Sequence, residues 1–293
     1  TAITKIGSDF EQGMAEVQAI SGATIEQMEM LEQAARDAKR FTARESASAF
    51  KYMAMAGWEA QEMLDGLDGI LNATTASGED LALVADIITD ALTAFGMSAA
   101  QSTELADLLA NTAMSANTNI GMLGESFKYV APIFGSLSYS AEDAALALGL
   151  MANAGIKSSQ AGTTLRAAVN NLVNPVGEAA ELMNQLGIKT TNAQGEMLPF
   201  KDLLDNLREI FAELTEEQQA QYAATLFGQQ AMSGMLAIIN ASDEDYQKLT
   251  EATRDYAGAA EEAADIMSDT LQGRLKELKV QLEELALMYF EII

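Results

Sequence analysis

The sequence predicts an all-α protein built from stacked helical hairpins, with a long C-terminal amphipathic helix and at most one short β-hairpin. Three observations indicate this fold. The 293-residue chain is 49% hydrophobic but only 6% aromatic, and only three prolines interrupt it, which is typical of closely packed helices. Capping boxes mark several helix starts. Turn residues recur about every twenty residues along the middle of the chain, as in helical arrays.

The first half of the chain shows where helices begin. Residues 1–21 form a helical pattern that places Phe10 and Val17 on one apolar face. After it come capping boxes, in which a hydroxyl accepts from a free backbone amide and a longer side chain reaches back to the cap. Four occur, each before an apolar helical pattern: Thr24 with Gln27, Thr42 with Glu45, Ser98 with Gln101, and Thr215 with Gln218.

Glycines punctuate the middle of the chain, and we expect them to end helices because glycine adopts positive φ at little cost. Gly57, Gly96 and Gly135 are spaced 39 residues apart. After an N-terminal helical segment at 1–40, residues 41–175 are therefore predicted to be a core of stacked hairpins. Trp58 is either a plug of this core or a binding anchor.

Two similar pentapeptides lie 77 residues apart, at 50–54 and 127–131. An internal duplication explains the similarity, and so does chance in alanine-rich helices. Both interpretations stay open at this point.

The stretch from Gly155 to Pro175 predicts a tight helix–turn–helix. Gly155 ends an apolar run, and Ser158 or Ser159 is expected to accept from the free amides of the next helix. Gly162 should let a neighbouring helix approach closely. A buried stripe follows, formed by Leu165, Ala168, Val169 and Leu172. A phosphate-binding loop is excluded because no strand precedes these glycines.

Arg166 and Pro175 complete this stretch. Arg166 lies on an otherwise weakly charged helix and is expected to pair with a buried carboxylate, in a structural role. Pro175 closes the segment, since proline cannot continue a helix.

Residues 176–242 are predicted to form a second helical subdomain. Its turn-rich segment at 188–199 favours a loop or a small β-hairpin. Helices are expected at 200–214, 216–227, 229–240 and from 243 onward, with Gly228 separating two short ones.

Residues 243–293 are predicted to contain the long C-terminal helix, with a three-heptad a/d seam that is typical of a coiled coil. Its members alternate four and three residues apart: Leu271, Leu275, Leu278, Leu282, Leu285, Tyr289 and Ile292. The seam predicts self-association as a trimer or another small oligomer. The alternative is an amphipathic helix that lies on its own domain.

Composition excludes several classes of function. The net charge of −26 argues against nucleic-acid binding through phosphate neutralisation. Without Cys or His, the chain offers no disulfide, no thiolate or imidazole catalyst and no zinc site that needs those ligands. No catalytic, cofactor-binding or metal-binding set is found, so we expect no enzyme and no cofactor. No apolar run is long enough to span a membrane.

Charge is also distributed unevenly. Between Lys51 and Lys128 there is no Lys or Arg, while eleven Asp and Glu occur. Such a tract is either a solvated acidic face or a surface that meets a basic partner. The chain starts at Thr1 rather than Met and ends on an open apolar helix, so we expect it to be a piece of a longer protein.

Short motifs along nearly the whole chain resemble the core region of phage tail tape measure proteins. The clearest occur between Gly155 and Arg166: Gly155-Ile156-Lys157, Gln160-Ala161-Gly162-Thr163 and Leu165-Arg166, followed by Pro175. Others agree in order: Phe50-Lys51-Tyr52-Met53-Ala54-Met55-Ala56-Gly57, Ala94-Phe95-Gly96, Lys128-Tyr129-Val130-Ala131-Pro132, Leu186-Gly187-Ile188 and Phe227-Gly228. The chain departs at Ser158, where the family usually has glycine, and at 37–40, where a family glycine before Phe41 is missing.

The resemblance implies a structural role in the tail of a phage or prophage. Such minor tail proteins occupy the lumen of the tail tube, act as the template on which the tube polymerises, set tail length and leave ahead of the DNA on genome ejection. Expected partners are further copies of the chain, tail-tube and baseplate or tail-tip proteins, and tail assembly chaperones, with no direct nucleic-acid binding. The expected location is the virion tail, at the tube lumen or tip, and the host cytoplasm during assembly.

A ruler helix extends by about 1.5 Å per residue, whereas this chain turns back about every twenty residues. We therefore expect it to be an anchoring or initiating body rather than the ruler itself. The alternative is a secreted or surface α-helical effector that perturbs membranes.

Overall fold

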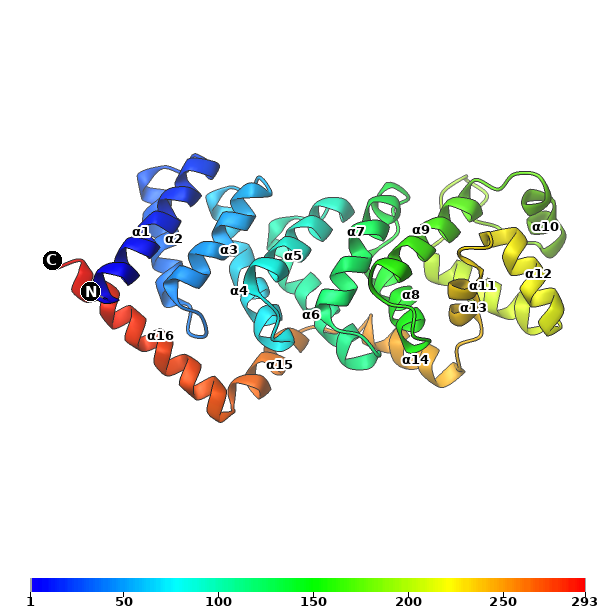
Figure 1. The fold of residues 1–293 in the computed structure, drawn as a ribbon. Coiled ribbons are helices and arrows are strands. Elements are labelled where there is room, and N and C mark those ends of the chain that lie inside the picture. Colours follow the sequence, from blue (N-terminus) through cyan, green and yellow to red (C-terminus); the bar gives the residue numbers. More distant parts are fainter. Residues whose placement is uncertain (1, 293) are drawn as a thin grey trace. The chain divides into compact units, whose positions relative to one another are not determined.

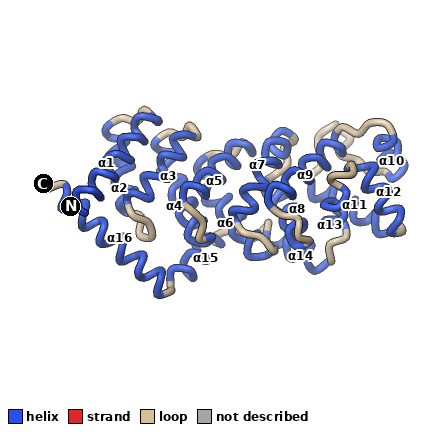
Figure 2. Tube along the Cα trace, viewed as in Figure 1, coloured by secondary structure: helices blue, strands red, loops and turns tan. Residues whose placement is uncertain are grey.

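The computed structural model describes residues 2–292, which confirm the all-α fold (Figures 1 and 2). The chain forms two compact units, and each unit is made of segments that are not contiguous in the sequence. Unit 1 comprises Thr1–Thr93, Met97–Ala110 and Ala257–Ile293. Unit 2 comprises Ala94–Gly96 and Asn111–Tyr256.

Unit 1 is built around the first four helices and the last two. Its elements are α1 (Ala2–Ser21), α2 (Ile25–Asp37), α3 (Ala43–Met55), α4 (Ala60–Ser77), most of α5 (Leu81–Phe95), η1 (Ala99–Gln101), the first part of α6 (Ser102–Ser115), α15 (Ala259–Ser268) and α16 (Leu271–Phe290). Helix α1 packs on α3 and α16, and α15 packs on α4. Trp58 is buried against Gly66 of α4, which confirms the core-plug interpretation.

Unit 2 contains eight complete helices among the described residues. They are α7 (Ile120–Ser136), α8 (Ala141–Asn153), α9 (Ser158–Val173), α10 (Glu178–Leu186), α11 (Phe200–Ala212), α12 (Glu216–Phe227), α13 (Met232–Ile239) and α14 (Asp243–Ala252). Helices α7 and α9 pack on each other. The rings of Phe134, Tyr139 and Phe200 meet in a buried cluster, with centroids 4.9 to 5.3 Å apart.

A half-buried arginine joins three helices of unit 2. Arg208 of α11 donates from Nη1 to the carbonyls of Ile238, Ile239 and Ala241 at 2.8 to 3.1 Å. These carbonyls lie at the C-terminal end of α13, where backbone acceptors lack helical partners. The same guanidinium lies 4.2 Å from the ring centroid of Tyr246. One side chain thus joins α11, α13 and α14, a role that the sequence pattern had not shown.

The predicted caps and most of the predicted glycine turns are present. All four capping boxes form, and Gly57, Gly96, Gly155 and Gly228 all have positive φ. Gly135 differs from the expectation, because it lies inside the last turn of α7 without a positive φ. Its missing side chain instead leaves room for the carbonyl oxygen of Ala94.

The stretch from Gly155 to Pro175 forms the predicted turn and helix. The stripe from Leu165 to Leu172 is buried, and Pro175 follows directly after the helix end. The cap expected from Ser158 or Ser159 is wrong, since α9 begins after Lys157 without a side-chain cap. Ser158 has φ +56°, and its carbonyl accepts from Ser126 Oγ at 2.7 Å. The position where the resemblance leads us to expect glycine is thus a left-handed one that carries serine in this chain.

The 188–199 segment fits the expected loop or small β-hairpin, since it is a loop with a single antiparallel bridge between Thr191 and Met197. Two later segments are more broken than the sequence predicts. The helix expected at 229–240 begins at Met232. The helical range from 243 onward is divided into α14, α15 and α16, so the long C-terminal helix is Leu271–Phe290.

Replacing Gly162 by alanine is expected to destabilise unit 2. A Cβ at this position would lie 2.5 Å from the carbonyl oxygen of Ser126, so α7 and α9 would have to separate. Such overpacking costs about 1–3 kcal/mol. Urea denaturation measures the effect. Gly13→Ala is the matched control: its Cβ would lie 3.4 Å from that of Ala47, and alanine is favoured over glycine in helices by about 1 kcal/mol. Equal effects of the two substitutions would contradict this packing argument.

Candidate interaction surface on the C-terminal helix

The position of α15 is fixed by a buried carboxylate. Asp107 of α6 is 5% exposed. It accepts from the amides of Gly258 at 2.7 Å and Ala260 at 2.9 Å. A carboxylate at the N-terminal end of α15 caps the free backbone amides, and the positive end of the helix dipole stabilises its negative charge. In the sequence Asp107 is only one member of the acidic tract, because nothing in the local pattern reveals a partner about 150 residues away in sequence.

Helix α16 follows α15 after a two-residue break. The hydroxyl of Thr270 accepts from the amide of Gly273 at 3.0 Å, which caps the new helix. Gly273 has no side chain to collide with the carbonyl of Ser268. The break therefore depends on a cap and a glycine, and it lets α16 leave α15 in a new direction.

One face of α16 packs on α1 and α3, and ion pairs of Arg36 join it to α2. Val280, Ala286 and Leu287 are buried on this face. The ring of Phe290 covers Gly7 of α1, where a larger residue would collide with it. The last helix thus ends beside the start of the first (Figure 1).

Arg36 and Arg44 hold this face in place, and Arg40, which lies between them in the sequence, holds α15. Arg44 donates to the Glu283 carboxylate from Nη2 at 2.9 Å and from Nε at 3.1 Å, and Glu283 is only 8% exposed. Arg36 pairs with Glu284 at 2.6 Å and with Glu291 at 2.5 Å. We call Arg36, Arg40 and Arg44 the arginine row. Arg36 pairs with Glu284 and Glu291, Arg40 with Asp265, and Arg44 with Glu283 and Asp9.

These pairs stabilise the charged form of the arginines. The hydrogen bonds that Arg36 donates to Glu284 raise the pKa of Arg36, although burial opposes this shift. Burial lowers the pKa of Arg44, but the hydrogen bonds and charges of Glu283 and Asp9 raise it overall.

The sequence analysis does not predict the arginine row. The pattern that could have indicated it is the four-residue spacing of positions 36, 40 and 44 in a chain with only 17 Lys and Arg.

The predicted seam lies on the other side of α16. All seven of its residues are exposed, between 51% and 80%: Leu271, Leu275, Leu278, Leu282, Leu285, Tyr289 and Ile292. Ile266, Met267 and Met288 are exposed as well. The helix does lie on its own unit, but through residues outside the seam. An apolar stripe of this length is typical of an interaction site.

The other predicted site residues shape turns and helix contacts within their own units. Arg166 is exposed and its guanidinium lies 5.7 Å from the ring centroid of Tyr129. The prediction that Arg166 pairs with a buried carboxylate is therefore wrong. Gly162 and Pro175 act as predicted, at a helix contact and a helix end.

Residues 2–292 contain no group of three or more His, Cys, Asp or Glu that could hold a metal ion. Within the same range, no helix has both the length and the apolar character needed to cross a membrane. The exposed stripe of α16 is accordingly the strongest candidate surface.

Comparison with known proteins gives related chains. The family described as "Phage-related minor tail protein" matches residues 27–228. The tape measure protein of Pneumococcus phage Dp-1 is 36% identical over 295 residues, which cover 100% of this chain and 26% of that relative. The probable tape measure protein of Escherichia phage P2 is 28% identical over 293 residues, which cover 97% of this chain and 36% of the relative. The chain thus spans between a quarter and two-fifths of these relatives. No solved structure matches it.

Removing the charge of Arg44 is expected to loosen α16. In the Arg44→Gln variant the buried Glu283 carboxylate loses its bidentate partner, which costs about 1–3 kcal/mol for a partly exposed pair. Chemical denaturation of the full chain measures the loss. Arg274→Gln is the control, since the Arg274–Asp269 pair is exposed by 70% and 78% and is worth about 0–1 kcal/mol. A loss no larger than that of the control would contradict the anchoring role of Arg44.

Proposed function

Because the chain belongs to the phage-related minor tail protein family, we propose that it is the compact helical body of a tape measure protein. In this role it helps to initiate assembly of the tail tube, contributes to length control and is released when the genome is ejected. It works in the phage tail, at the tube lumen or tip, after assembly in the host cytoplasm. The observation that carries the proposal is the similarity to a tape measure protein over 100% of this chain.

The fold supports a body rather than a ruler. The longest helices within residues 2–292, α1 and α16, have 20 residues each, which corresponds to about 30 Å. In each unit helices turn back and bury apolar faces on their neighbours. The number of residues therefore does not add up to a length, as it does in one continuous helix.

The exposed seam supports self-association, so the first partner in this proposal is another copy of the chain. Leucines at a and d positions pack knobs into holes in a coiled coil. The seam and the docking face lie on different sides of α16, so a second copy can bind without displacing α16 from unit 1. The proposed assembly is a trimer or another small oligomer. The further partners are tail-tube proteins, tail-tip or baseplate proteins and assembly chaperones.

Charges in the seam are expected to abolish self-association. Leu278→Asp combined with Leu282→Asp places two carboxylates in the apolar interface, where burial of charge is costly. Analytical ultracentrifugation should show oligomers of the intact chain and monomers of the variant. Ile25→Asp with Met55→Asp is the control, because these apolar residues are 74% and 63% exposed away from the seam. A monomeric intact chain at high concentration would disprove the coiled coil.

An in-frame deletion of residues 97–135 in the phage tests the role of the body. The deletion removes η1, α6 and nearly all of α7, so α9 loses the helix it packs on. We expect few or no tails, or tails of uncontrolled length, as seen by negative-stain microscopy. If the region were part of the ruler, the yield would be normal and the tails shorter by about 59 Å, at about 1.5 Å for each deleted residue.

A further inference from the structure

The two flanks of the seam on α16 are charged in the first half of the helix. When the seam residues occupy positions a and d of a heptad, the e and g positions beside them set how two helices pair. The first half has Arg274 at g and Lys279 at e, whose side chains are 70% and 58% exposed. In the second half the e and g residues carry no charge: Gln281, Ala286 and Met288. Cationic flanks therefore mark one end of the seam.

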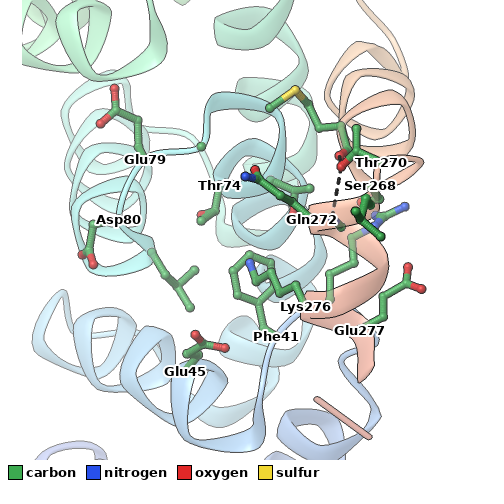
Figure 3. Close-up of a pocket in the computed structure, with 17 residues that line it drawn as sticks. Phe41, Glu45, Thr74, Glu79, Asp80, Ser268, Thr270, Gln272, Lys276 and Glu277 are labelled. Atoms are coloured by element: carbon green, nitrogen blue, oxygen red, sulfur yellow. Dashed lines mark hydrogen bonds between the residues drawn. The ribbon is translucent and has the colours of Figure 1, made fainter. Parts of the chain in front are cut away.

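The third basic residue of the first half does not flank the seam. Lys276 lies over the ring of Phe41, with its ammonium 3.8 Å from the ring centroid (Figure 3). Arg274, by contrast, pairs with Asp269, which is itself 78% exposed. An ion pair so open to water contributes little. Arg274 can therefore exchange Asp269 for another partner.

Carboxylates lie beside the second half of the seam. Glu284 comes four residues before Met288 and Glu291 three residues after it, so the three side chains share one side of the helix. Both carboxylates pair with the same guanidinium, that of Arg36, and their side chains are 31% and 60% exposed. Two carboxylates thus share one cation at the edge of the seam.

A parallel pair of these helices would set like charges against each other. In parallel coiled coils a g residue faces the e residue five positions later in the other copy. Arg274 would then face Lys279, and the symmetry of a dimer would repeat this contact on its other side. Parallel pairing therefore places two repulsive contacts at the flanks and no attractive one.

We propose that a second copy binds with its α16 antiparallel, as a dimer with twofold symmetry. This inference rests on the self-association in the proposed function and adds its direction. Because the helices run in opposite directions, each a residue faces a d residue: Leu271 faces Tyr289, Leu275 faces Leu285, and Leu278 faces Leu282. This register matches every seam residue within Leu271–Phe290, since Ile292 lies beyond the end of the helix.

Antiparallel pairing brings the cationic flank of one copy to the acidic flank of the other. A g residue now faces a g residue, so Arg274 of one copy lies beside Met288 of the other and reaches Glu284 and Glu291. Met288 and Glu284 line a groove of about 500 Å³ between α16 and the end of α2, which leaves room for the arginine. The attractive contact occurs twice in a symmetric dimer.

One like-charge contact remains, between the two copies of Lys279 near the twofold axis. Each ammonium lies 4.0 Å from a carboxylate oxygen of Glu45 and 3.9 Å from one of Glu283. These carboxylates offset part of the repulsion between the two lysines. The balance of two attractive contacts and one shielded repulsion favours the antiparallel pair over the parallel one.

Disulfide formation tests the direction, because the chain has no cysteine of its own. Leu271→Cys and Tyr289→Cys are made as separate variants of the full chain, one with a tag that changes its mass, and are oxidised alone or after mixing. The mixture should give disulfide-linked dimers and neither variant alone should. Two copies of the same cysteine lie 18 residues apart along the axis, about 27 Å, whereas a disulfide joins Cα atoms within about 7 Å.

The outcomes separate this inference from the proposed function. A monomeric chain in sedimentation contradicts the self-association itself, and this inference with it. Oligomers in which each variant crosslinks with itself, or in which the mixture does not crosslink, overturn the antiparallel pair and leave self-association intact. A trimer overturns it as well, since three helices cannot all run antiparallel to one another.

Charge reversal at Arg274 gives a second test, in which the two directions predict opposite signs. In the antiparallel pair Arg274→Glu sets a carboxylate beside Glu284 and Glu291, so the Kd of the dimer from sedimentation equilibrium at low salt should rise about tenfold. In a parallel pair the same carboxylate would face Lys279, and Kd would fall. Arg254→Glu is the control, because it changes the net charge equally at an exposed residue of unit 2. It should leave Kd within about twofold. A fall in Kd for Arg274→Glu, or a rise no larger than that of the control, overturns the proposal.

Discussion

The ion pair between Arg44 and Glu283 is the interaction on which the arrangement of unit 1 depends. It joins residues 239 apart in sequence and brings α16 back onto the helices that begin the chain. The chain carries 43 acidic and 17 basic residues, so the carboxylates of α16 that approach this surface would be repelled from it without cationic partners. Three arginines in one row neutralise the carboxylates that approach them, and their forked geometry fixes where each carboxylate sits. The apolar contacts of α16 then form around a position that charge has already selected.

Local signals predicted local structure well, and long-range partners lay beyond them. Capping boxes succeeded because the donor and acceptor lie within one turn of each other. The prediction that glycines end helices held at some positions only, because glycine serves two structural purposes. Gly57 adopts a positive φ, whereas Gly135 leaves space for a neighbouring backbone. Asp107, Arg208 and the arginine row act across the fold, and their partners cannot be read from neighbouring residues. Heptad spacing predicted the seam of the candidate surface. It did not predict the face through which α16 is anchored to unit 1.

Helix α16 thus carries two surfaces of opposite chemistry. Its docking face uses charge pairs and is specific, since each carboxylate meets a defined guanidinium. Its seam is apolar and can pack with any complementary stripe in register. Because apolar association is little affected by salt while charge pairing is screened, the two contacts of this one helix respond differently to ionic conditions.

The contact of Phe290 with Gly7 also bears on the order in which the protein folds. Helical hairpins form from neighbours in sequence, but α16 must close a loop of nearly the whole chain, which is entropically costly and slow. During synthesis α1 to α3 leave the ribosome well before α16 exists. With 239 residues separating Arg44 from Glu283, translation at about 5–20 residues per second leaves their docking face open for about 10–50 seconds. The arginines on that face keep it charged, and therefore soluble, until its own helix arrives.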